Sequence, residues 1–399
     1  MSASTIAARR TRISGTTAGW VGIALAVLAA YVALPPLAVR TAIVPLLIAA
    51  LGVAAGVYAI REGAFRIGWI AAVSAVLGAM LAVIAVKSGE GNLEKVFVWS
   101  ALTAGMLRFA TPLIFAAMGG IVSERSGVIN IGLEGMMLTG AFFGIYGSDL
   151  TGSWVGGLLI GAAAGAALGL IHAVLCISLR ADQVVSGTGI NILALGMTGY
   201  IFIYHYGSQG TPPGVSRVPD VNLPGVENVG FVGDAIGHAN LLTWGALILV
   251  PVLTLYLFRT RSGLRLRSVG EKPRAADTVG LPVIRTRYLA VVTSGALAAI
   301  GGAYLSIALL GSFNENMTAG RGFIALAAVI FGGWRPWGAL AGALLFGFST
   351  ALAQRLPAFS ESTAVLFQAL PYVLTLVVVA GVIGRSRPPA AIGVPYVKE

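Results

Sequence analysis

The stretch RTRSGLRLRSVGEKPRAADTVGLPVIRTR, residues 259–287, determines how the rest of the chain is arranged. It contains eight of the 26 Lys and Arg residues and only two acidic residues, whereas the runs on either side, 241–258 and 288–310, are apolar. A basic loop between two apolar spans stays on the cytoplasmic side of a membrane, by the positive-inside rule. The sequence therefore predicts a cytoplasmic loop at 259–287, which sets the orientation of the other spans.

The middle of this loop has the pattern of a short helix. Pro273 suits the first turn of a helix, residues 274–278 read as one or two turns, and Gly280 can end them in the left-handed conformation. A short helix held outside the membrane can dock a soluble partner. A plain basic loop that only fixes topology explains the same composition, so both interpretations stay open.

The composition indicates an all-α polytopic membrane protein. Of the 399 residues, 57% are hydrophobic and 10% are charged, and the mean hydropathy is +0.88. Soluble domains have about 25% charged residues, so a chain this apolar belongs in a bilayer. The net charge of +11 lies in loops and tails, where membrane topology and anionic lipid explain it better than nucleic acid does.

Few residues in the chain are suited to catalysis or metal binding. Cys176 is the single cysteine, which excludes an internal disulfide, and His172, His205 and His238 are far apart in the sequence. No glycine-rich loop followed by Lys and Ser or Thr is present, so the chain has no P-loop. We expect no catalytic residue, no metal site and no cofactor on this chain, and any ATP hydrolysis on another subunit.

The apolar runs predict about 10 to 12 membrane-embedded helices, some short or broken. Spans at 20–34, 41–60 and 67–86 form an N-terminal extension of three transmembrane helices, residues 1–95. The remainder, residues 96–399, forms the core. Both termini are expected in the cytoplasm, because Arg residues precede the first span and follow the last.

Two polar features interrupt the core. The segment 207–240 is rich in Pro and Gly and has an excess of acids, which places it outside the cell; it could receive a binding protein or be an ordered surface loop. Arg108 lies within the span 97–118, where a charge costs roughly 2.5–3.5 kcal/mol on insertion scales. Packing at an interface and a role in a transport pathway explain it equally well.

The segment GGIVSERSGVINIGLEGMMLTGAFFG, residues 119–144, is the strongest candidate for a transport site. Four polar residues lie between apolar runs too closely for an ordinary loop and span, namely Glu124, Arg125, Asn130 and Glu134. Glycines among them would let the backbone unwind, as in the broken helices that line transport sites. The alternative is a short cytoplasmic loop in which Ser126 or Asn130 caps a helix and Glu134 lies in its first turn.

An internal echo suggests a two-fold plan. GMMLTGAFFG (135–144) and SWVGGLLIGAAAG (153–165) are echoed by GFIALAAVIFG (322–332) and PWGALAGALLFG (336–347). The first copy starts inside and the second outside, as in an inverted repeat with the substrate site at its interface. A chance match between Gly- and Ala-rich segments is the competing explanation.

Four ordered motifs, the last of them in two parts, together resemble the permease subunits of bacterial ABC importers of the nucleoside type, a group that also includes sugar and branched-chain amino acid permeases. They are SERSGVINIGLEGMMLTGAFFG, GEKPRAADTVGL, GRGFIALAAVIFGGWRPWGALAGALLFG, LPYVLTL and GRSRPPAAIGVPYVKE, within residues 103–399. The resemblance implies a multi-pass protein of the bacterial plasma membrane that works by alternating access. It implies four partners: a second permease in a heterodimer, a cytoplasmic ABC ATPase carrying ATP and Mg, an extracellular solute-binding protein and membrane lipid.

The resemblance also implies roles for particular residues. The short helix of the basic loop would be the element that couples to the ATPase, through Gly270, Glu271, Pro273, Ala276, Asp277 and Gly280. The resemblance gives no substrate site at the level of residues; from their chemistry alone, we expect the substrate pathway to be lined by residues of the first copy and residues elsewhere whose groups can hydrogen-bond ribose or stack on a base. They are Asn130, Glu134, Met137, Thr139, Asn191, Arg321 and Phe323.

Three other functions remain open from the sequence. A permease for a simple sugar or a branched-chain amino acid would have the same architecture. A stand-alone secondary transporter or channel belongs to a different class and often carries more ionisable residues in its spans than this chain does. A membrane enzyme lacks support, because no catalytic constellation is present.

Overall fold

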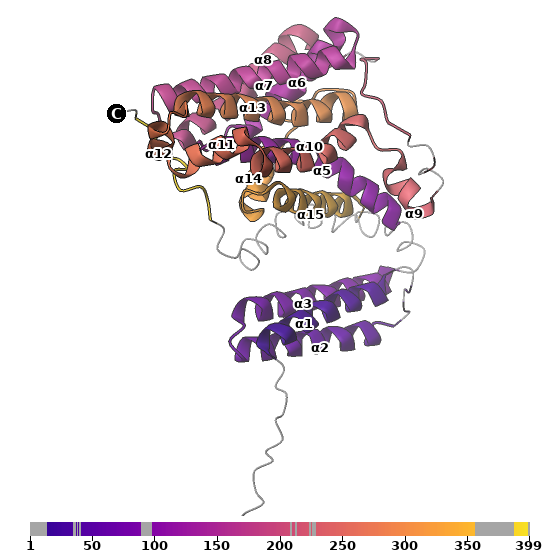
Figure 1. Cartoon of the computed structure of the whole chain (residues 1–399). Helices are drawn as coiled ribbons and strands as arrows, with labels where there is room; N and C mark the ends of the chain where they lie inside the picture. The colour runs from indigo at the N-terminus through magenta and orange to yellow at the C-terminus, as the bar shows by residue number, and fades with distance from the viewer. Residues whose placement is uncertain are drawn as a thin grey trace, which may run out of the picture. The chain divides into compact units, whose positions relative to one another are not determined.

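The computed structural model describes residues 14–34, 37, 39, 41–88, 98–207, 210–211, 214–222, 225, 229–355 and 387–397 (Figure 1). Its regular elements in these ranges are helices, and eight of them are long and apolar enough to cross a membrane. The all-α polytopic membrane fold is therefore confirmed. The expected last span at 367–383 lies outside the described residues. The chain divides into two compact units, residues 1–98 with 353–384 and residues 99–352 with 385–399, which are described separately.

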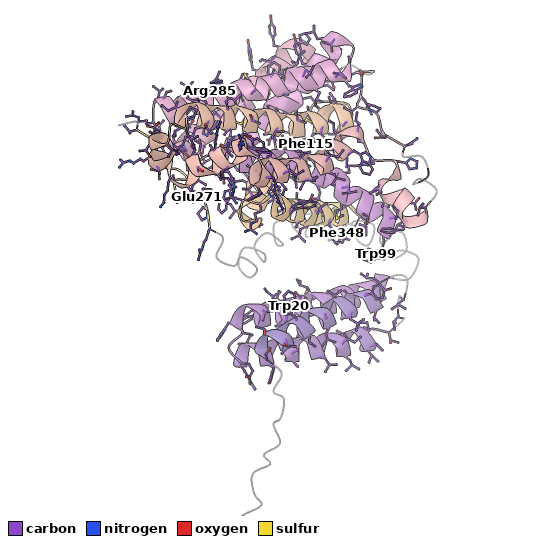
Figure 2. The ribbon with its side chains drawn as sticks, in the orientation of Figure 1. Trp20, Trp99, Phe115, Glu271, Arg285 and Phe348 are labelled. Atoms are coloured by element: carbon purple, nitrogen blue, oxygen red, sulfur yellow. The ribbon has the colours of Figure 1, made fainter. Side chains whose placement is uncertain are left out.

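Three helices make up the described part of the first unit: α1 (Gly15–Ala33), α2 (Ile43–Arg61) and α3 (Phe65–Ser88). They touch through small residues, since a Cβ added to Gly22 would lie 2.8 Å from Ala71 Cβ and 3.0 Å from Gly52 O. Large apolar side chains face outward, including Trp20, which is 66% exposed (Figure 2). Small residues inside and large ones outside are typical of helices packed in lipid.

The second unit contains the remaining helices. Its long helices are α5 (Trp99–Arg125), α6 (Leu133–Thr151), α7 (Trp154–Ala173), α8 (Gln183–Tyr206), α10 (Leu241–Arg259), α13 (Val283–Ala303) and α15 (Pro336–Arg355). Its short helices are α9 (Gly230–Val232), α11 (Arg261–Glu271), α12 (Pro273–Thr278) and α14 (Arg321–Phe331). Three π-helical segments follow α7, α9 and α13, at Val174–Ser178, Gly233–Gly237 and Tyr304–Leu310.

Helix α13 is the centre of this unit and packs on α5, α6 and α7 (Figure 1). Small residues bring the backbones into contact: a Cβ on Gly140 would lie 2.1 Å from Ala299 O, and one on Gly302 would lie 1.7 Å from Met137 O. Close approach of this kind allows helices to associate in lipid, where apolar burial gives little driving force. Because α13 contacts α5, α6 and α7, the position of a residue along α13 can be used to describe how far its neighbours lie from either end of the unit.

The basic loop is more helical than the sequence suggested. A helix from Pro273 was expected and is present as α12, and Gly280 has the predicted left-handed conformation, with φ +82°. The preceding helix α11 was not expected. Its buried residues Gly263, Leu266 and Gly270 recur at helical spacing, while Arg261 and Arg265 lie on the exposed face. The many charges of this stretch obscured that periodicity.

The two ends of the second unit differ in charge. Figure 2 shows Glu271 and Arg285 at one end of the helices and Trp99 at the other. We call the end that carries α11 and α12 the basic end and the opposite one the far end. The segment that begins at Pro336 is a full-length helix of 20 residues, α15.

Candidate functional site

The chain between α5 and α6 enters the interior of the helical unit without helical structure. This first break comprises residues 126–132. At the start of the break, Arg287 Nε donates to Ser126 O. Arg287 lies within the first turn and a half of α13. Further along, Asn130 Nδ2 donates to Ser294 Oγ at 2.9 Å, and Ser294 lies about 16 Å along α13 from Val283 at 1.5 Å per residue. The break therefore runs from the basic end to the middle of the unit.

Side chains from neighbouring helices satisfy the backbone of the first break. Gln183 Oε1 accepts from Ile129 N at 2.7 Å, and His172 Nε2 is 2.9 Å from Ile129 O. Ser123 Oγ donates to Val128 O at 2.8 Å. In a bilayer each unsatisfied backbone group costs several kcal/mol, so irregular backbone at this depth persists only where protein supplies partners. His172 is such a partner.

Asn191 holds the first turn of α6. Its Oδ1 accepts from Gly135 N at 2.8 Å, and its Nδ2 donates to Ile131 O at 3.0 Å. The expected alternative, a cap by Ser126 or Asn130, is not present, because Gly132 is the capping position and Ser126 Oγ donates to Ser123 O. Glu134 does lie in the first turn of α6, as that alternative expected, and residues 126–132 are non-helical backbone between α5 and α6.

A second break descends from the far end. The π-helical segment after α13 ends at Leu310, and the chain has no regular helix until α14 begins at Arg321. Phe313 packs edge-to-face on Phe142 of α6 and Phe202 of α8, with ring centroids 5.3 and 5.1 Å apart. Asn316 and Ala319 both have positive φ, which non-glycine residues rarely adopt. The segment is held in an unusual path that leads back to α6.

The two breaks meet at the Glu134 carboxylate. Glu134 is 8% exposed and accepts three hydrogen bonds, from Thr318 Oγ1 at 2.6 Å, Gly320 N at 2.8 Å and Gly322 N at 2.6 Å. A Cβ on Gly322 would lie 2.5 Å from Glu134 Cα, so the first turns of α6 and α14 touch. Both helix N-termini carry partial positive charge, and the carboxylate between them compensates for it. We call Glu134, Thr318, Gly320 and Gly322 the Glu134 joint.

The helices leave the Glu134 joint in opposite directions. Helix α6 runs parallel to α13 towards the far end, because Gly140 and Gly144 face Ala299 and Ala303 in turn. Helix α14 runs to the basic end, where the indole of Trp334 donates to Glu124 and Arg125 Nε donates to Trp334 O at 3.0 Å. Each helix then turns back, as α7 and as α15. This is the arrangement that an inverted repeat predicts.

The other predicted pathway residues have different environments. Met137 and Thr139 are buried in α6, and Thr139 Oγ1 has no hydrogen-bond partner among the described residues. Arg321 Nη1 donates to Met317 O and Thr318 O, at 2.9 and 3.0 Å, and so closes the second break. Phe323 is 48% exposed on the surface of the unit. The structure thus places Glu134 in the joint and Arg321 between its members Gly320 and Gly322 in the sequence, with Asn130 and Asn191 supporting the first break.

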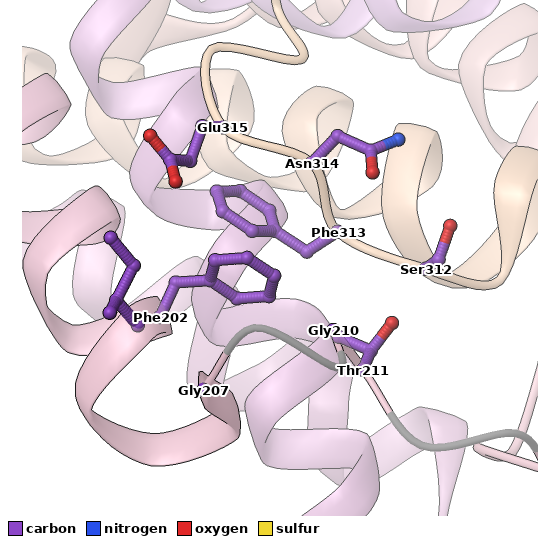
Figure 3. A pocket seen from close by; sticks show the side chains of 9 residues that line it. Phe202, Gly207, Gly210, Thr211, Ser312, Phe313, Asn314 and Glu315 are labelled. Carbon is purple, nitrogen blue, oxygen red and sulfur yellow. The ribbon is translucent and has the colours of Figure 1, made fainter.

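A cleft of about 600 Å³ opens beside the second break at the far end (Figure 3). Its lining residues are Phe202, Ile203, Gly207, Gly210, Thr211, Ser312, Phe313, Asn314 and Glu315. Figure 3 shows the Phe202 and Phe313 rings next to each other, with Glu315 close by. The sequence analysis missed this cleft, although the polar run 312–316 at the end of an apolar span was a signal for it.

The predicted coupling residues lie together at the basic end. A Cβ on Gly270 would lie 2.1 Å from Arg125 O, so α11 rests on the end of α5. Ala276 is the buried residue of α12, and Pro273 occupies the first turn of this helix. Leu281 N donates to Ala276 O and Gly280 N to Asp277 O, which closes α12 in a glycine-ended cap. Glu271 is exposed, and its Oε2 accepts from Ala390 N at 3.1 Å.

Known proteins match most of the chain. The family described as "Branched-chain amino acid transport system / permease component" matches residues 102–379. The guanosine ABC transporter permease protein NupQ of Bacillus subtilis is 41% identical over 324 residues, covering 77% of this chain and 99% of the relative. The nucleoside ABC transporter permease protein NupC of Lactococcus lactis is 41% identical over 309 residues, covering 75% and 97%.

The same comparisons extend to a relative named for glucose transport and to further permease proteins. A provisionally named glucose ABC transporter permease protein of Haloferax volcanii is 40% identical over 263 residues, covering 64% of this chain and 78% of the relative. The guanosine ABC transporter permease protein NupP of Bacillus subtilis is 25% identical, covering 60% of this chain and 70% of the relative, and the nucleoside ABC transporter permease protein NupB of Lactococcus lactis is 27% identical, covering 59% and 67%. No solved structure matches the chain.

Proposed function

Because the chain belongs to the family of branched-chain amino acid transport system permease components, we propose that it is the translocation subunit of an ATP-driven nucleoside importer. The basic end of the second unit faces the cytoplasm of a bacterial cell, the far end faces outward, and both chain termini are cytoplasmic. The excess of Lys and Arg in the loop 259–287 supports this orientation.

The Glu134 joint carries the mechanistic part of the proposal. Two helix N-termini meet there at the middle of the unit, each reached by non-helical backbone from an opposite end. Sites of this kind bind polar solutes in transporters with inverted repeats. Alternating access then requires the two breaks to separate and re-form around Glu134, with Asn130, Met137, Thr139, Asn191, Arg321 and Phe323 contributing to the pathway.

The relatives and the cleft support a nucleoside as the solute. Two relatives at 41% identity are named for guanosine and nucleoside transport. The cleft at the far end offers the Glu315 carboxylate and the Asn314 amide, which suit ribose hydroxyls, and the Phe202 and Phe313 rings beneath them. A simple sugar is the alternative within the same architecture, supported by the relative named for glucose.

The proposed partner proteins are those of an ATP-driven importer. The paired relatives NupP and NupQ, and NupB and NupC, support a second permease that completes the pore as a heterodimer. A cytoplasmic ABC ATPase, which binds ATP and Mg, would dock on α12 and the end of α11. An extracellular solute-binding protein would deliver the nucleoside at the far end. Gly270, Glu271, Pro273, Ala276, Asp277 and Gly280 would form the docking element.

Reconstitution in liposomes tests the proposal and separates it from an ion-driven transporter. The complete complex should take up labelled guanosine only with its binding protein and ATP, and the same complex carrying an ATPase that cannot hydrolyse ATP should not. Uptake of guanosine by this chain without the ATPase would contradict the proposal and favour a secondary transporter or channel.

A further inference from the structure

The C-terminal segment, Arg387 to Val397, has no role in the function proposed so far, yet it is tied to two functional elements. Ala391 N donates to Gly270 O at 2.9 Å, and Ala390 N donates to Glu271 Oε2 at 3.1 Å. These bonds attach the segment to the last turn of α11. We call residues 387–397 the tail.

The tail also holds α12. Tyr396 is 9% exposed and packs in a cluster with Val269 of α11, Ala276 of α12 and Val283 of α13. Helix α12 has only six residues, and Ala276 is its buried residue. A helix this short has little stability of its own, so its position depends on what packs against Ala276. Tyr396 is one of the buried side chains of that cluster.

The other contacts of the tail lead to the first break. Gly393 N donates to Gly127 O at 3.1 Å, and Arg287 Nη1 donates to Val394 O at 3.1 Å. Arg287 is 1% exposed and also donates to Ser126 O through Nε at 3.2 Å. The tail and Arg287 therefore hold the start of the break whose other end is the Glu134 joint.

We infer that the tail is a positioning segment that links α12 to the first break, so that displacement of α12 moves residues 126–132. The inference rests on the proposed function, because it assigns the tail to the coupling of ATP hydrolysis with transport. The path runs from α12 through Tyr396, then through the tail backbone to Gly127 and Ser126. A contact chain of this kind becomes a coupling path only if both ends respond together, which is the property to test.

Two single substitutions on the tail provide a matched pair. Tyr396→Ala removes the buried ring, whereas Val397→Ala shortens a side chain that is 46% exposed. Hydrogen exchange of the whole complex should show faster exchange both in 273–281 and in 126–131 for Tyr396→Ala, and no change for Val397→Ala. Faster exchange confined to 273–281 would overturn the link to the first break, whatever solute the complex carries.

Transport provides the functional readout. We expect Tyr396→Ala to lower guanosine uptake at least fivefold while ATP hydrolysis continues, and Val397→Ala to transport normally. A chain that ends after residue 386 should lose coupling more completely than one that lacks only residues 398–399. Normal uptake by Tyr396→Ala would contradict a role in coupling, whereas absence of guanosine uptake by the unaltered complex would remove the nucleoside function and leave the exchange result to decide on the tail.

Discussion

A single carboxylate joins the two halves of the broken-helix arrangement. Glu134 starts α6 and accepts the backbone N–H groups of Gly320 and Gly322 at the start of α14, together with the Thr318 hydroxyl. Backbone donors at a helix N-terminus need an acceptor, and an ionised carboxylate is a stronger one than a neutral group. Glu134 therefore accepts hydrogen bonds from three groups that lie 184 or more residues away in the sequence, at and just before the start of α14.

Replacing Glu134 by Gln should loosen the joint. A Gln amide keeps one acceptor oxygen but turns an NH₂ group towards at least one backbone donor, and each buried donor left unsatisfied costs about 1–3 kcal/mol. We expect a lower unfolding temperature in detergent and at least a tenfold loss of nucleoside uptake. Glu62→Gln, at an exposed position after α2, is the control. Unchanged stability and uptake in Glu134→Gln would contradict the role of the joint.

The cleft makes a different prediction, about the sugar of the nucleoside. If Glu315 accepts ribose hydroxyls, Glu315→Gln should raise the KM for guanosine several-fold and leave the KM for 2′,3′-dideoxyguanosine nearly unchanged, because that analogue lacks both hydroxyls. Asp234→Asn is the control, because Asp234 is an exposed acidic residue in a different segment, 207–240, and it should change the KM for neither solute. Equal effects on both solutes would show that Glu315 does not contact ribose.

The sequence indicated part of this site and could not indicate the rest. Asn130 and Glu134 stood out because polar residues are rare in apolar runs. Their partners did not: the donors to Glu134 include glycine N–H groups, which leave no side-chain signal. His172 and Gln183 looked like ordinary residues of a helix and a helix end, because only the fold brings them to Ile129 O and N.

At the scale of elements, the contact between α6 and α13 sets the frame of the second unit. Gly302 faces Met137 O, and Gly140 faces Ala299 O, at distances that leave no room for a side chain. The sequence showed the small residues of these spans but not which pairs meet. The helical repeat fixes which residues share a face, whereas the partner of that face depends on the whole fold.

Gly302→Ala should separate the two helices. The new Cβ would lie 1.7 Å from Met137 O, and accommodating extra atoms in a packed interior costs about 1–3 kcal/mol. Gly196→Ala in α8 is the control, because a Cβ there meets nothing within 4 Å, and alanine favours a helix by up to about 1 kcal/mol. Thermal unfolding in detergent should show Gly302→Ala less stable and Gly196→Ala equally or more stable. Equal stability of the two variants would contradict this packing.

Substituting two glycines of the basic loop, Gly270 and Gly280, should have different effects, because only one of them has a close neighbour where a Cβ would be added. Gly270→Ala places a Cβ 2.1 Å from Arg125 O and should displace α11, so that ATP hydrolysis no longer drives uptake. Gly280→Ala meets no neighbour within 4 Å and has only the strain of a left-handed alanine, roughly 1–2 kcal/mol. We expect the loss of uptake per ATP hydrolysed to be much larger for Gly270→Ala. The reverse order would show that the end of α12 matters more than the contact of α11.

At the scale of the whole molecule, the chain combines a transport unit with an additional helical unit. The family match begins at residue 102, so α1, α2 and α3 lie outside it. The sequence predicted the membrane class from composition alone, since a chain with 10% charged residues cannot form an ordinary soluble domain. In the proposed function the solute is specified by a few groups in the cleft, which composition and periodicity do not reveal.

Uptake by cells with and without this gene tests the central claim most directly. Labelled guanosine, uridine, glucose, ribose and leucine would be measured side by side, with a plasmid copy of the unaltered gene restoring the deletion strain. We predict that deletion abolishes uptake of guanosine or uridine and leaves glucose, ribose and leucine unchanged. Loss of sugar or leucine uptake with normal nucleoside uptake would contradict the nucleoside assignment, and no loss for any solute would contradict the importer itself.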